Sequence, residues 1–301
     1  MSFSVDHIRH LYDFQSHYLD LEGQRYHYLD EGQGEAVVMV HGNPSWSFMY
    51  RELARSLRKT YRVIVPDHMG CGLSDKPDSS VYPYTLERRA DDLEELLDQL
   101  GITSNITLVV HDWGGPIGMR FATRHPDRIA RLVIFNTAAF LLSGMKKLHW
   151  SLHFCRSSRL AAFLILKFNA FARVATYMGC RSQPMPREIR RAYAGPYDSS
   201  KNRIANLAFV RDIPLSPTDP AYAPLQEVQE KLHRFQETPM LICWGERDFV
   251  FDRDFLEEWI KRFPQADVHR FPEAGHYVLE ELPEVIIPLV KEFLEKPSQG
   301  Q

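Results

Sequence analysis

The stretch VVHDWGGPIG, residues 109–118, joins an apolar run to a helix-like pattern through the turn His-Asp-Trp-Gly-Gly. Where a buried strand turns sharply into a helix in this way, the residue at the turn is often a serine nucleophile. In this chain the residue at the turn is Asp112. The stretch therefore predicts a strand, a tight turn and a helix that present a carboxylate instead of a hydroxyl.

Size and composition indicate one large domain with room for an inserted subdomain. The chain has 301 residues, of which 44% are hydrophobic, and a net charge of −3, which gives no reason to bind nucleic acid. The four cysteines are scattered and the histidines show no HxH or HExxH spacing, so we expect reduced thiols, no metal site and no cofactor. The first residues lack a basic segment followed by an apolar one, so we expect no secretory signal and a cytoplasmic location.

Strand-like and helix-like patterns alternate along most of the chain, beginning with two runs, SHYLDLEG and QRYHYLDEG, that predict an antiparallel pair. Continued alternation indicates an α/β fold with a mostly parallel central sheet and helices on both faces. The alternation breaks where LAAFLILKFNAFARVATYMG is apolar but too short and too charged to span a membrane. We predict a core from residues 1–139 and 215–301, and an inserted helical cap at residues 140–214.

Three ionisable side chains follow three of the predicted strands. Asp112 follows the run NITLVV, Asp248 lies in WGERDFVF, and His276 lies in PEAGHYVLEELP. Because the carboxyl ends of parallel strands meet at one edge of a sheet, we expect these three side chains to lie close together. Their order along the chain, a nucleophile, then an acid, then a histidine, is typical of a hydrolytic triad. Glu246 is the alternative acid.

These motifs resemble the α/β-hydrolase superfamily and, more narrowly, its haloalkane dehalogenase branch. HGNPSWSFMYR, PDHMGCGLSDKP, HDWGGPIG and GHYVLEELPE match that branch, and the resemblance covers nearly the whole chain. It implies an α/β-hydrolase fold with Asp112 as nucleophile and His276 as general base. Some members place the acid after an earlier strand, but here that segment reads IFNTAAF, with Asn136 and no carboxylate. Asp248 is therefore the better candidate for the supporting acid.

An aspartate nucleophile favours a different chemistry from a serine nucleophile. A carboxylate is already ionised at neutral pH and needs no base to activate it. It can displace a leaving group at a saturated carbon and form an ester that activated water can hydrolyse, whereas a serine would form an ether. In dehalogenases, residues that match Asn43 and Trp113 hold the departing halide through side-chain N–H groups. The backbone N–H groups of the same two residues are alternative oxyanion donors.

The predicted cap resembles a narrower group, the beta-lactone decarboxylases of bacterial long-chain olefin biosynthesis. The resemblance rests on RRAYAGPYDSSKNRIANLAFVRDIPLSP, NTAAF and KFNAFAR. It implies conversion of a cis-3,4-dialkyl-oxetan-2-one to a cis-alkene and carbon dioxide, with Asp112 attacking either the carbonyl or the ring C–O carbon. Polar cap residues become candidate substrate contacts, and Arg203 is either a carboxyl-binding group or part of a structural ion pair. These candidates are Tyr197, Asn202 and Arg203.

Other functions stay open on the sequence. Haloalkane dehalogenation would use the same triad with water, and epoxide hydrolysis would need two cap phenols, for which Tyr193 and Tyr197 are available. A catalytically silent binding protein on this fold is the alternative outside enzymes. An intact set of Asp112, Asp248 and His276 argues against it.

The charge of the predicted cap suggests partners beyond a small lipophilic substrate. Residues 141–203 contain twelve Lys and Arg against two acidic residues. Such a segment can dock an acidic partner or an anionic membrane surface. The resemblance to the olefin pathway implies a multi-enzyme assembly with a beta-lactone synthetase and a reductase. We expect charge reversal at Arg187, Arg190 and Arg191 to weaken such an association.

Overall fold

A computed structural model of the chain describes residues 3–141 and 149–296. Its centre is an eight-stranded sheet with the strand order β1-β2-β4-β3-β5-β6-β7-β8. The pairings β1–β2 and β2–β4 are antiparallel, and all the later pairings are parallel. The strands are β1 (His17–Leu21), β2 (Gln24–Glu31), β3 (Ala36–Val40), β4 (Arg62–Pro66), β5 (Ile106–Asp112), β6 (Ile129–Thr137), β7 (Met240–Gly245) and β8 (Asp267–Phe271).

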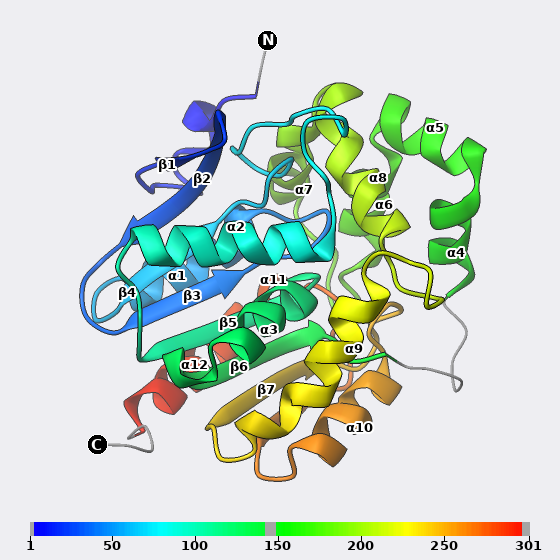
Figure 1. Cartoon of the computed structure of the whole chain (residues 1–301). Helices are drawn as coiled ribbons and strands as arrows, with labels where there is room; N and C mark the ends of the chain where they lie inside the picture. The colour runs from blue at the N-terminus through cyan, green and yellow to red at the C-terminus, as the bar shows by residue number, and fades with distance from the viewer. Residues whose placement is uncertain (1–2, 142–148, 297–301) are drawn as a thin grey trace.

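Helices cover both faces of this sheet, as the continuous apolar strands require (Figure 1). Along β3, Val38 and Val40 join one buried cluster, while Val37 and Met39 join the other. The first cluster includes side chains of α2, α3, α9 and α10, and the second includes side chains of α1 and α12. The core helices are α1 (Arg51–Leu57), α2 (Leu86–Gln99), α3 (Gly114–Arg124), α9 (Tyr222–Lys231), α10 (Arg253–Arg262), α11 (Val278–Glu281) and α12 (Pro283–Glu295).

A second group of helices interrupts the alternation between β6 and α9 and lies together at one side of the molecule (Figure 1). These helices are α4 (Trp150–Ser157), α5 (Arg159–Phe168), α6 (Ala170–Met178), α7 (Arg187–Ala194) and α8 (Ile204–Arg211). Short 3₁₀ segments occupy Val5–Ile8, Ser47–Tyr50, Pro126–Arg128, Gly195–Tyr197, Lys201–Arg203 and Leu232–Phe235.

The helices α4–α8 fall within the cap predicted for residues 140–214, of which 142–148 lie outside the described residues. The division into a core and a cap stays a proposal. Among the described residues, no single helix has the length and apolar character needed to cross a membrane. The pair α5 and α6 meets those criteria when taken together, but the two helices are bent by 88°.

Candidate active site

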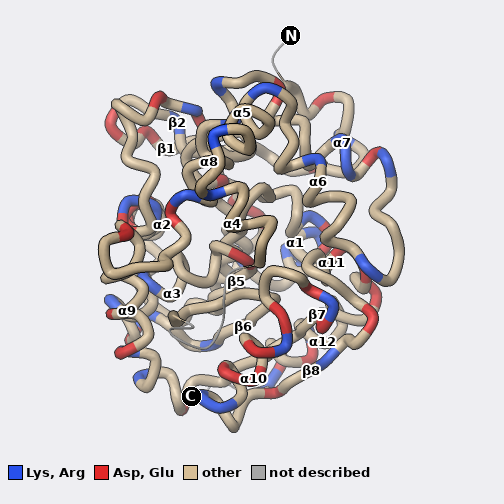
Figure 2. Tube along the Cα trace, turned by 90° about the vertical axis from the view of Figure 1, so that its right-hand side faces the viewer, with Lys and Arg blue, Asp and Glu red and all other residues tan. Residues whose placement is uncertain are grey.

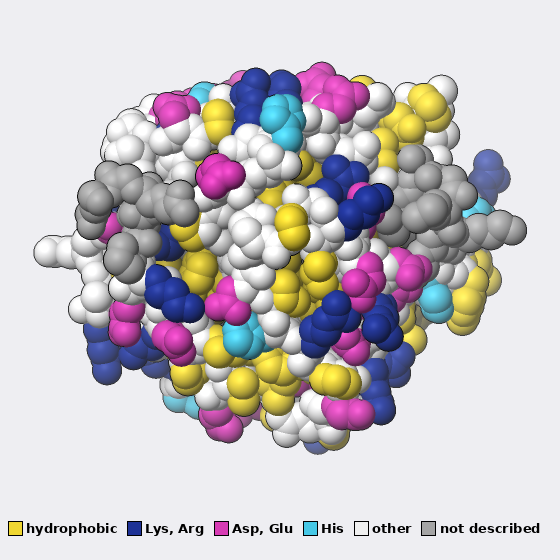
Figure 3. All heavy atoms as spheres, turned by 90° about the horizontal axis from the view of Figure 1, so that it is seen from below, with side chains coloured by type: hydrophobic (Ala, Val, Ile, Leu, Met, Phe, Trp, Pro, Cys, Tyr) yellow, Lys and Arg dark blue, Asp and Glu magenta, His cyan; other side chains and the backbone are white. Residues whose placement is uncertain are grey.

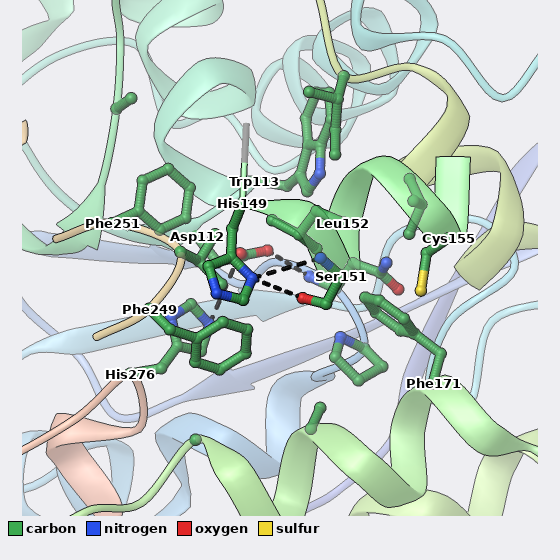
Figure 4. A pocket seen from close by; sticks show the side chains of 18 of the residues that line it. Asp112, Trp113, His149, Ser151, Leu152, Cys155, Phe171, Phe249, Phe251 and His276 are labelled. Carbon is green, nitrogen blue, oxygen red and sulfur yellow. Dashed lines mark hydrogen bonds and ion pairs between the residues drawn. The ribbon is translucent and has the colours of Figure 1, made fainter. Parts of the chain in front are cut away.

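The sheet brings together the three side chains predicted from the strand ends. Asp112 is the last residue of β5, Asp248 lies in the turn after β7, and His276 lies between β8 and α11. His276 Nδ1 is 2.8 Å from Asp248 Oδ2. His276 Nε2 is 3.6 Å from Asp112 Oδ2, a contact that Figure 4 shows. All three side chains are buried, and Asp248 is fully so. The imidazole therefore lies between two carboxylates at the carboxyl edge of the sheet.

Asp112 occupies a sharp turn that the flanking residues make possible. Its φ of 52° lies in the left-handed region, a conformation that costs energy for residues other than glycine and is concentrated at functional sites. Helix α3 then begins at Gly114, where a Cβ would overlap the carbonyl oxygen of Val40. The backbone N–H of Asn43 donates to Asp112 Oδ1 at 2.6 Å. One carboxylate oxygen is thus held by the backbone, while the other faces His276.

The pKa values of Asp112 and His276 are both raised, but for different reasons. Burial raises the pKa of the Asp112 carboxyl above its ordinary value, and the His276 ring and the N–H groups of Asn43 and Trp113 only partly offset this. Burial lowers the pKa of His276, but Asp248 and then Asp112 outweigh it, so its pKa lies above the ordinary value. The site therefore favours a protonated, positively charged His276 beside Asp112.

Asp248 is itself held in place by neighbours that the sequence did not single out for that role. The backbone N–H of Val250 donates to Asp248 Oδ1 at 2.7 Å, and Asn136 Nδ2 donates to Oδ2 at 3.1 Å. Asn136 also exchanges two hydrogen bonds of 2.9 Å with the backbone of Gly245. Asn136 thus orients the acid instead of replacing it. The alternative acid, Glu246, lies 3.3 Å from Arg270.

His111 is a further neighbour of the site that sequence reasoning missed. It is fully buried, and its Nε2 lies 2.8 Å from the backbone carbonyl oxygen of His276. Its ring centroid is 4.5 Å from that of His276. Burial lowers the pKa of His111 well below its ordinary value, so the ring stays neutral and donates to this carbonyl group. Its position directly before Asp112 was the available signal.

The two predicted anion donors lie beside Asp112. Asn43 is buried, and its side-chain Nδ2 donates to the carbonyl oxygen of Asn206 at 3.1 Å, while its backbone N–H binds Asp112. Trp113 lies on the cavity wall, with its indole nitrogen directed toward the cavity (Figure 4). Both residues are thus placed next to the carboxylate, and their roles in holding an anion stay predictions.

The structure places the three tentative substrate contacts elsewhere. The Tyr197 hydroxyl donates to Ser45 O at 3.2 Å, and Arg203 donates to the carbonyl oxygens of Tyr197 and Leu166, each at 2.7 Å. Asn202 Nδ2 donates to an Asp198 oxygen at 2.7 Å. The described cavity wall includes none of Tyr197, Asn202 and Arg203. Arg203 uses its guanidinium to join two segments of backbone, and contact of these three residues with substrate stays a prediction.

A cavity of about 650 Å³ opens above the carboxylate and is lined mainly by apolar side chains. Asp112 and His276 lie on its wall, and Phe251 stacks on the His276 ring at 6.1 Å between centroids. Sequence reasoning missed a polar pair on the wall, His149 and Ser151, whose Nδ1 and Oγ are 2.8 Å apart. The other wall residues from the second group of helices come from α4, α5, α6 and α8 and include Leu152, Cys155, Ala161, Leu164, Ile165, Phe171, Val174, Ala175, Met178 and Val210.

The described residues contain no group of three or more His, Cys, Asp or Glu side chains placed to hold a metal ion. A buried carboxylate, an imidazole with a raised pKa and N–H donors next to an apolar cavity suit nucleophilic attack on a lipophilic electrophile.

Sheet order, sharp turn and triad arrangement define the α/β-hydrolase class. A family model described as "alpha/beta hydrolase fold" matches residues 35–283, and the chain belongs to this family. It is 53% identical over 284 residues to the cis-3-alkyl-4-alkyloxetan-2-one decarboxylase of Shewanella oneidensis, covering 94% of this chain and 89% of that protein. The enzyme of the same name from Xanthomonas campestris pv. campestris is 48% identical, with 95% and 97% covered. Within the α/β hydrolases, the chain thus belongs to the family of these decarboxylases.

More distant relatives are dehalogenases. A haloalkane dehalogenase of Mycolicibacterium paratuberculosis is 33% identical, covering 90% of this chain and 89% of that protein. The crystal structure of a haloalkane dehalogenase from Agrobacterium tumefaciens C58 matches with a TM-score of 0.83 at 25% identity, covering 93% of this chain and 96% of that one. These findings confirm the predicted fold and both predicted resemblances.

Proposed function

We propose that this protein is a beta-lactone decarboxylase, a carboxy-lyase that converts a cis-3,4-dialkyl-oxetan-2-one to a cis-alkene and carbon dioxide. The observation that carries the proposal is a buried aspartate, Asp112, at the wall of a large apolar cavity. The curated relatives at 53% and 48% identity bear the name of this activity and support it.

Displacement by a carboxylate accounts for the reaction without water. Asp112 Oδ2 attacks the ring carbon that bears the ring oxygen, the C–O bond breaks, and its electron pair leaves on the new substrate carboxylate. The bond from that carboxylate to the neighbouring carbon then breaks and releases carbon dioxide. Its electron pair forms the alkene as the ester bond to Asp112 breaks. Asp112 recovers its own oxygens, and no net proton is exchanged.

The stereochemistry of the product follows from these two steps. Displacement inverts the attacked carbon, and elimination with the two departing groups on opposite sides of the new double bond then gives the cis-alkene from the cis-lactone. A cavity that holds both alkyl chains keeps the intermediate from rotating freely. Each buried methylene contributes about 0.8 kcal/mol to binding, so two long chains are held firmly by apolar walls.

In this scheme, the neighbouring residues stabilise the negative charge that moves during the reaction. We assign His276, oriented and held positive by Asp248, to face the negative charge as it moves from Asp112 to the departing carboxylate. Asn43 and Trp113 donate N–H groups to oxygen atoms that gain charge. Apolar walls exclude water, which protects the ester from hydrolysis and leaves the new carboxylate poorly solvated.

Haloalkane dehalogenation is the second candidate, because a donor pair like Asn43 and Trp113 also suits a halide. Epoxide hydrolysis is less suited to this site. The Tyr193 hydroxyl is hydrogen-bonded to Glu280 Oε1 at 2.7 Å, and the Tyr197 hydroxyl donates to Ser45 O. Neither phenol is directed to a substrate oxygen at Asp112.

A comparison of two substrate classes tests the proposal. Purified protein is incubated with a cis-dialkyl beta-lactone and, separately, with 1-bromoalkanes, and alkene and bromide are quantified. Alkene with little bromide supports the proposal. Bromide without alkene makes the protein a dehalogenase, and a beta-hydroxy acid from the lactone makes it a lactone hydrolase.

We also propose a location and partners for the protein. We place the protein in the cytoplasm, in an assembly with a beta-lactone synthetase and a reductase, because a strained and lipophilic lactone is best passed on directly. Charge reversal at Arg187, Arg190 and Arg191 on α7 should weaken that assembly in a co-purification assay. Persistence of the assembly in this variant would remove α7 from the interface.

A further inference from the structure

Large apolar side chains are exposed on the outer surface of α4, α5 and α6, which we call the α4–α6 face. Of the eleven large hydrophobic residues that are exposed in the described parts of the chain, seven lie here. Four of the seven are aromatic and more than half exposed. The seven residues are Trp150, Phe154, Leu160, Phe163, Phe168, Val174 and Tyr177. Such a concentration on one face is unusual for a surface that meets only water.

The helices of this face are apolar on two sides. On α5, Ala161, Leu164 and Ile165 line the cavity, whereas Leu160 and Phe163, three residues apart, point outward. A helix that is apolar on both sides normally buries both. The inner side of α5 lines the cavity, whereas no other element in the described part of the chain covers its outer side.

Positive charge accompanies these apolar side chains. Residues 149–186 contain five Lys and Arg and no Asp or Glu. Arg159, Lys167 and Arg173 are exposed among the apolar residues (Figure 2 views the molecule from this side). Elsewhere the pattern differs, and the face in Figure 3 mixes acidic and basic side chains. The α4–α6 face is thus both apolar and uniformly basic.

The cavity reaches this same face. Phe154 on α4 and Val174 on α6 both line the cavity, and their exposed fractions are 41% and 50%. Side chains that touch both the cavity and the solvent mark its mouth. An apolar molecule that leaves the cavity here emerges among exposed aromatic and aliphatic side chains.

We propose that the α4–α6 face docks onto the surface of an anionic lipid bilayer, with the cavity mouth toward the lipid. Aromatic and aliphatic side chains beside Lys and Arg are the composition of interfacial membrane-binding helices, and the absence of acidic residues complements anionic headgroups. A second copy of the chain fits less well, because a symmetric contact would set this basic face against itself. Docking itself does not depend on the reaction, but the lipophilic cargo exchanged with the lipid is that of the proposed function.

Trp150 provides a direct probe of docking. It is 75% exposed, whereas Trp46, Trp113, Trp244 and Trp259 are buried. Vesicles of phosphatidylcholine with 30% phosphatidylglycerol should shift the Trp150 fluorescence to shorter wavelength. Brominated acyl chains in the vesicle lipids should quench this fluorescence. Pure phosphatidylcholine vesicles should have a much smaller effect. The Trp150→Phe variant should lose the spectral change while still co-sedimenting with the vesicles.

Matched surface variants separate this face from the rest of the molecule. Removing two cations with Arg159→Gln and Lys167→Gln should weaken vesicle binding about 25-fold, at about fivefold for each charge, and the apolar-to-acidic change Phe163→Glu should also weaken it. Lys261→Gln on α10 and Val285→Glu on α12, which are also exposed, should leave binding unchanged.

Two results would overturn the proposal. One is no co-sedimentation with anionic vesicles and no spectral change. The other is a dimer in solution that Phe163→Glu dissociates while vesicles have no effect, which would make the face a contact between copies. Alkene formation from a dispersed short-chain lactone without vesicles is measured in parallel. It tests the proposed function separately, so that failure of one proposal is not read as failure of the other.

Discussion

Replacing Asp248 with asparagine removes the negative charge that holds His276 positive, while nearly preserving the shape of the side chain. The acid is fully buried and lies 2.8 Å from His276 Nδ1. Two unit charges at that distance attract by about 6 kcal/mol at an effective dielectric constant of 20. Loss of one partner of a buried pair costs about 3–5 kcal/mol in practice. If the proposed reaction needs the imidazolium, kcat should fall between about a hundredfold and a few thousandfold, at tenfold per 1.36 kcal/mol.

The pH dependence of kcat in the same variant tests the role of Asp248 independently. With Asp248 gone, burial still lowers the pKa of His276, and Asp112 alone remains to raise it. The alkaline limb of the kcat profile should therefore move to lower pH in Asp248→Asn. The assay is alkene release from a beta-lactone between pH 5 and pH 9, with circular dichroism to show that the variant is folded.

Glu246→Gln is the matched control, since Glu246 pairs with Arg270 at the surface. It should leave both the rate and the profile unchanged. A loss of less than tenfold in Asp248→Asn, or an alkaline limb that stays in place, would refute the reasoning. A comparable loss in Glu246→Gln would assign the acid to the wrong residue.

Four further predictions follow from the same geometry. Asp112→Asn should abolish alkene formation, because an amide cannot displace the ring oxygen, and unchanged turnover would reject the nucleophile. Trp113→Phe should lower kcat about a hundredfold with little change in KM, as for loss of one oxyanion donor; an unchanged kcat would leave the indole a packing role. Ala161→Phe places a larger side chain in the cavity and should lower kcat/KM about fourfold for each substrate methylene that no longer fits. The measurement is kcat/KM for a series of lactones of increasing alkyl chain length, and the shortest lactones, which still fit, serve as the control. For Asp67, burial raises the pKa, but the His27 ring and the Leu73 N–H outweigh it and hold the pKa below its ordinary value. Ionised Asp67 therefore stabilises the fold above a pH of about 4, and this stabilisation is lost in acid. Urea titration should show that Asp67→Asn lowers the free energy of unfolding at pH 7 by about 3–5 kcal/mol. The difference in stability between the two proteins should become smaller as the pH falls.

The arrangement of Asp112, Asp248 and His276 was accessible from sequence because parallel strands end at a common edge. Each side chain follows a recognisable strand, so their meeting point depends on the sheet and not on residue spacing. The tight turn at Asp112 was likewise indicated by the glycines that follow it. Their catalytic roles remain predictions, although the distances between them suit those roles.

The polar cap residues show what sequence reasoning leaves open. Polarity in the segment that contains Tyr197, Asn202 and Arg203 suggested contact with substrate, but polarity does not say which way a side chain points. Arg203 is occupied by carbonyl oxygens, one of them on Leu166, 37 residues away. Such backbone partners carry no mark in the sequence.

Asn136 and His111 illustrate the opposite error. In the sequence, Asn136 marks only the absence of a carboxylate, yet its side chain donates a hydrogen bond to Asp248. His111 is known from the sequence only as the residue before Asp112, yet its ring contacts the backbone of His276. Both act through residues more than 100 positions away. Their part in the site becomes visible only once the strands are set in register.

Turnover of a beta-lactone in ¹⁸O-labelled water tests the central claim most directly, because it asks whether water ever attacks the ester on Asp112. After many turnovers, the peptide that contains Asp112 is analysed by mass spectrometry, with a 1-bromoalkane as the comparison substrate. The account predicts that alkene accumulates while the Asp112 carboxylate stays unlabelled, since elimination returns its own oxygens. Incorporation of ¹⁸O into Asp112 during lactone turnover would show hydrolysis and contradict the account.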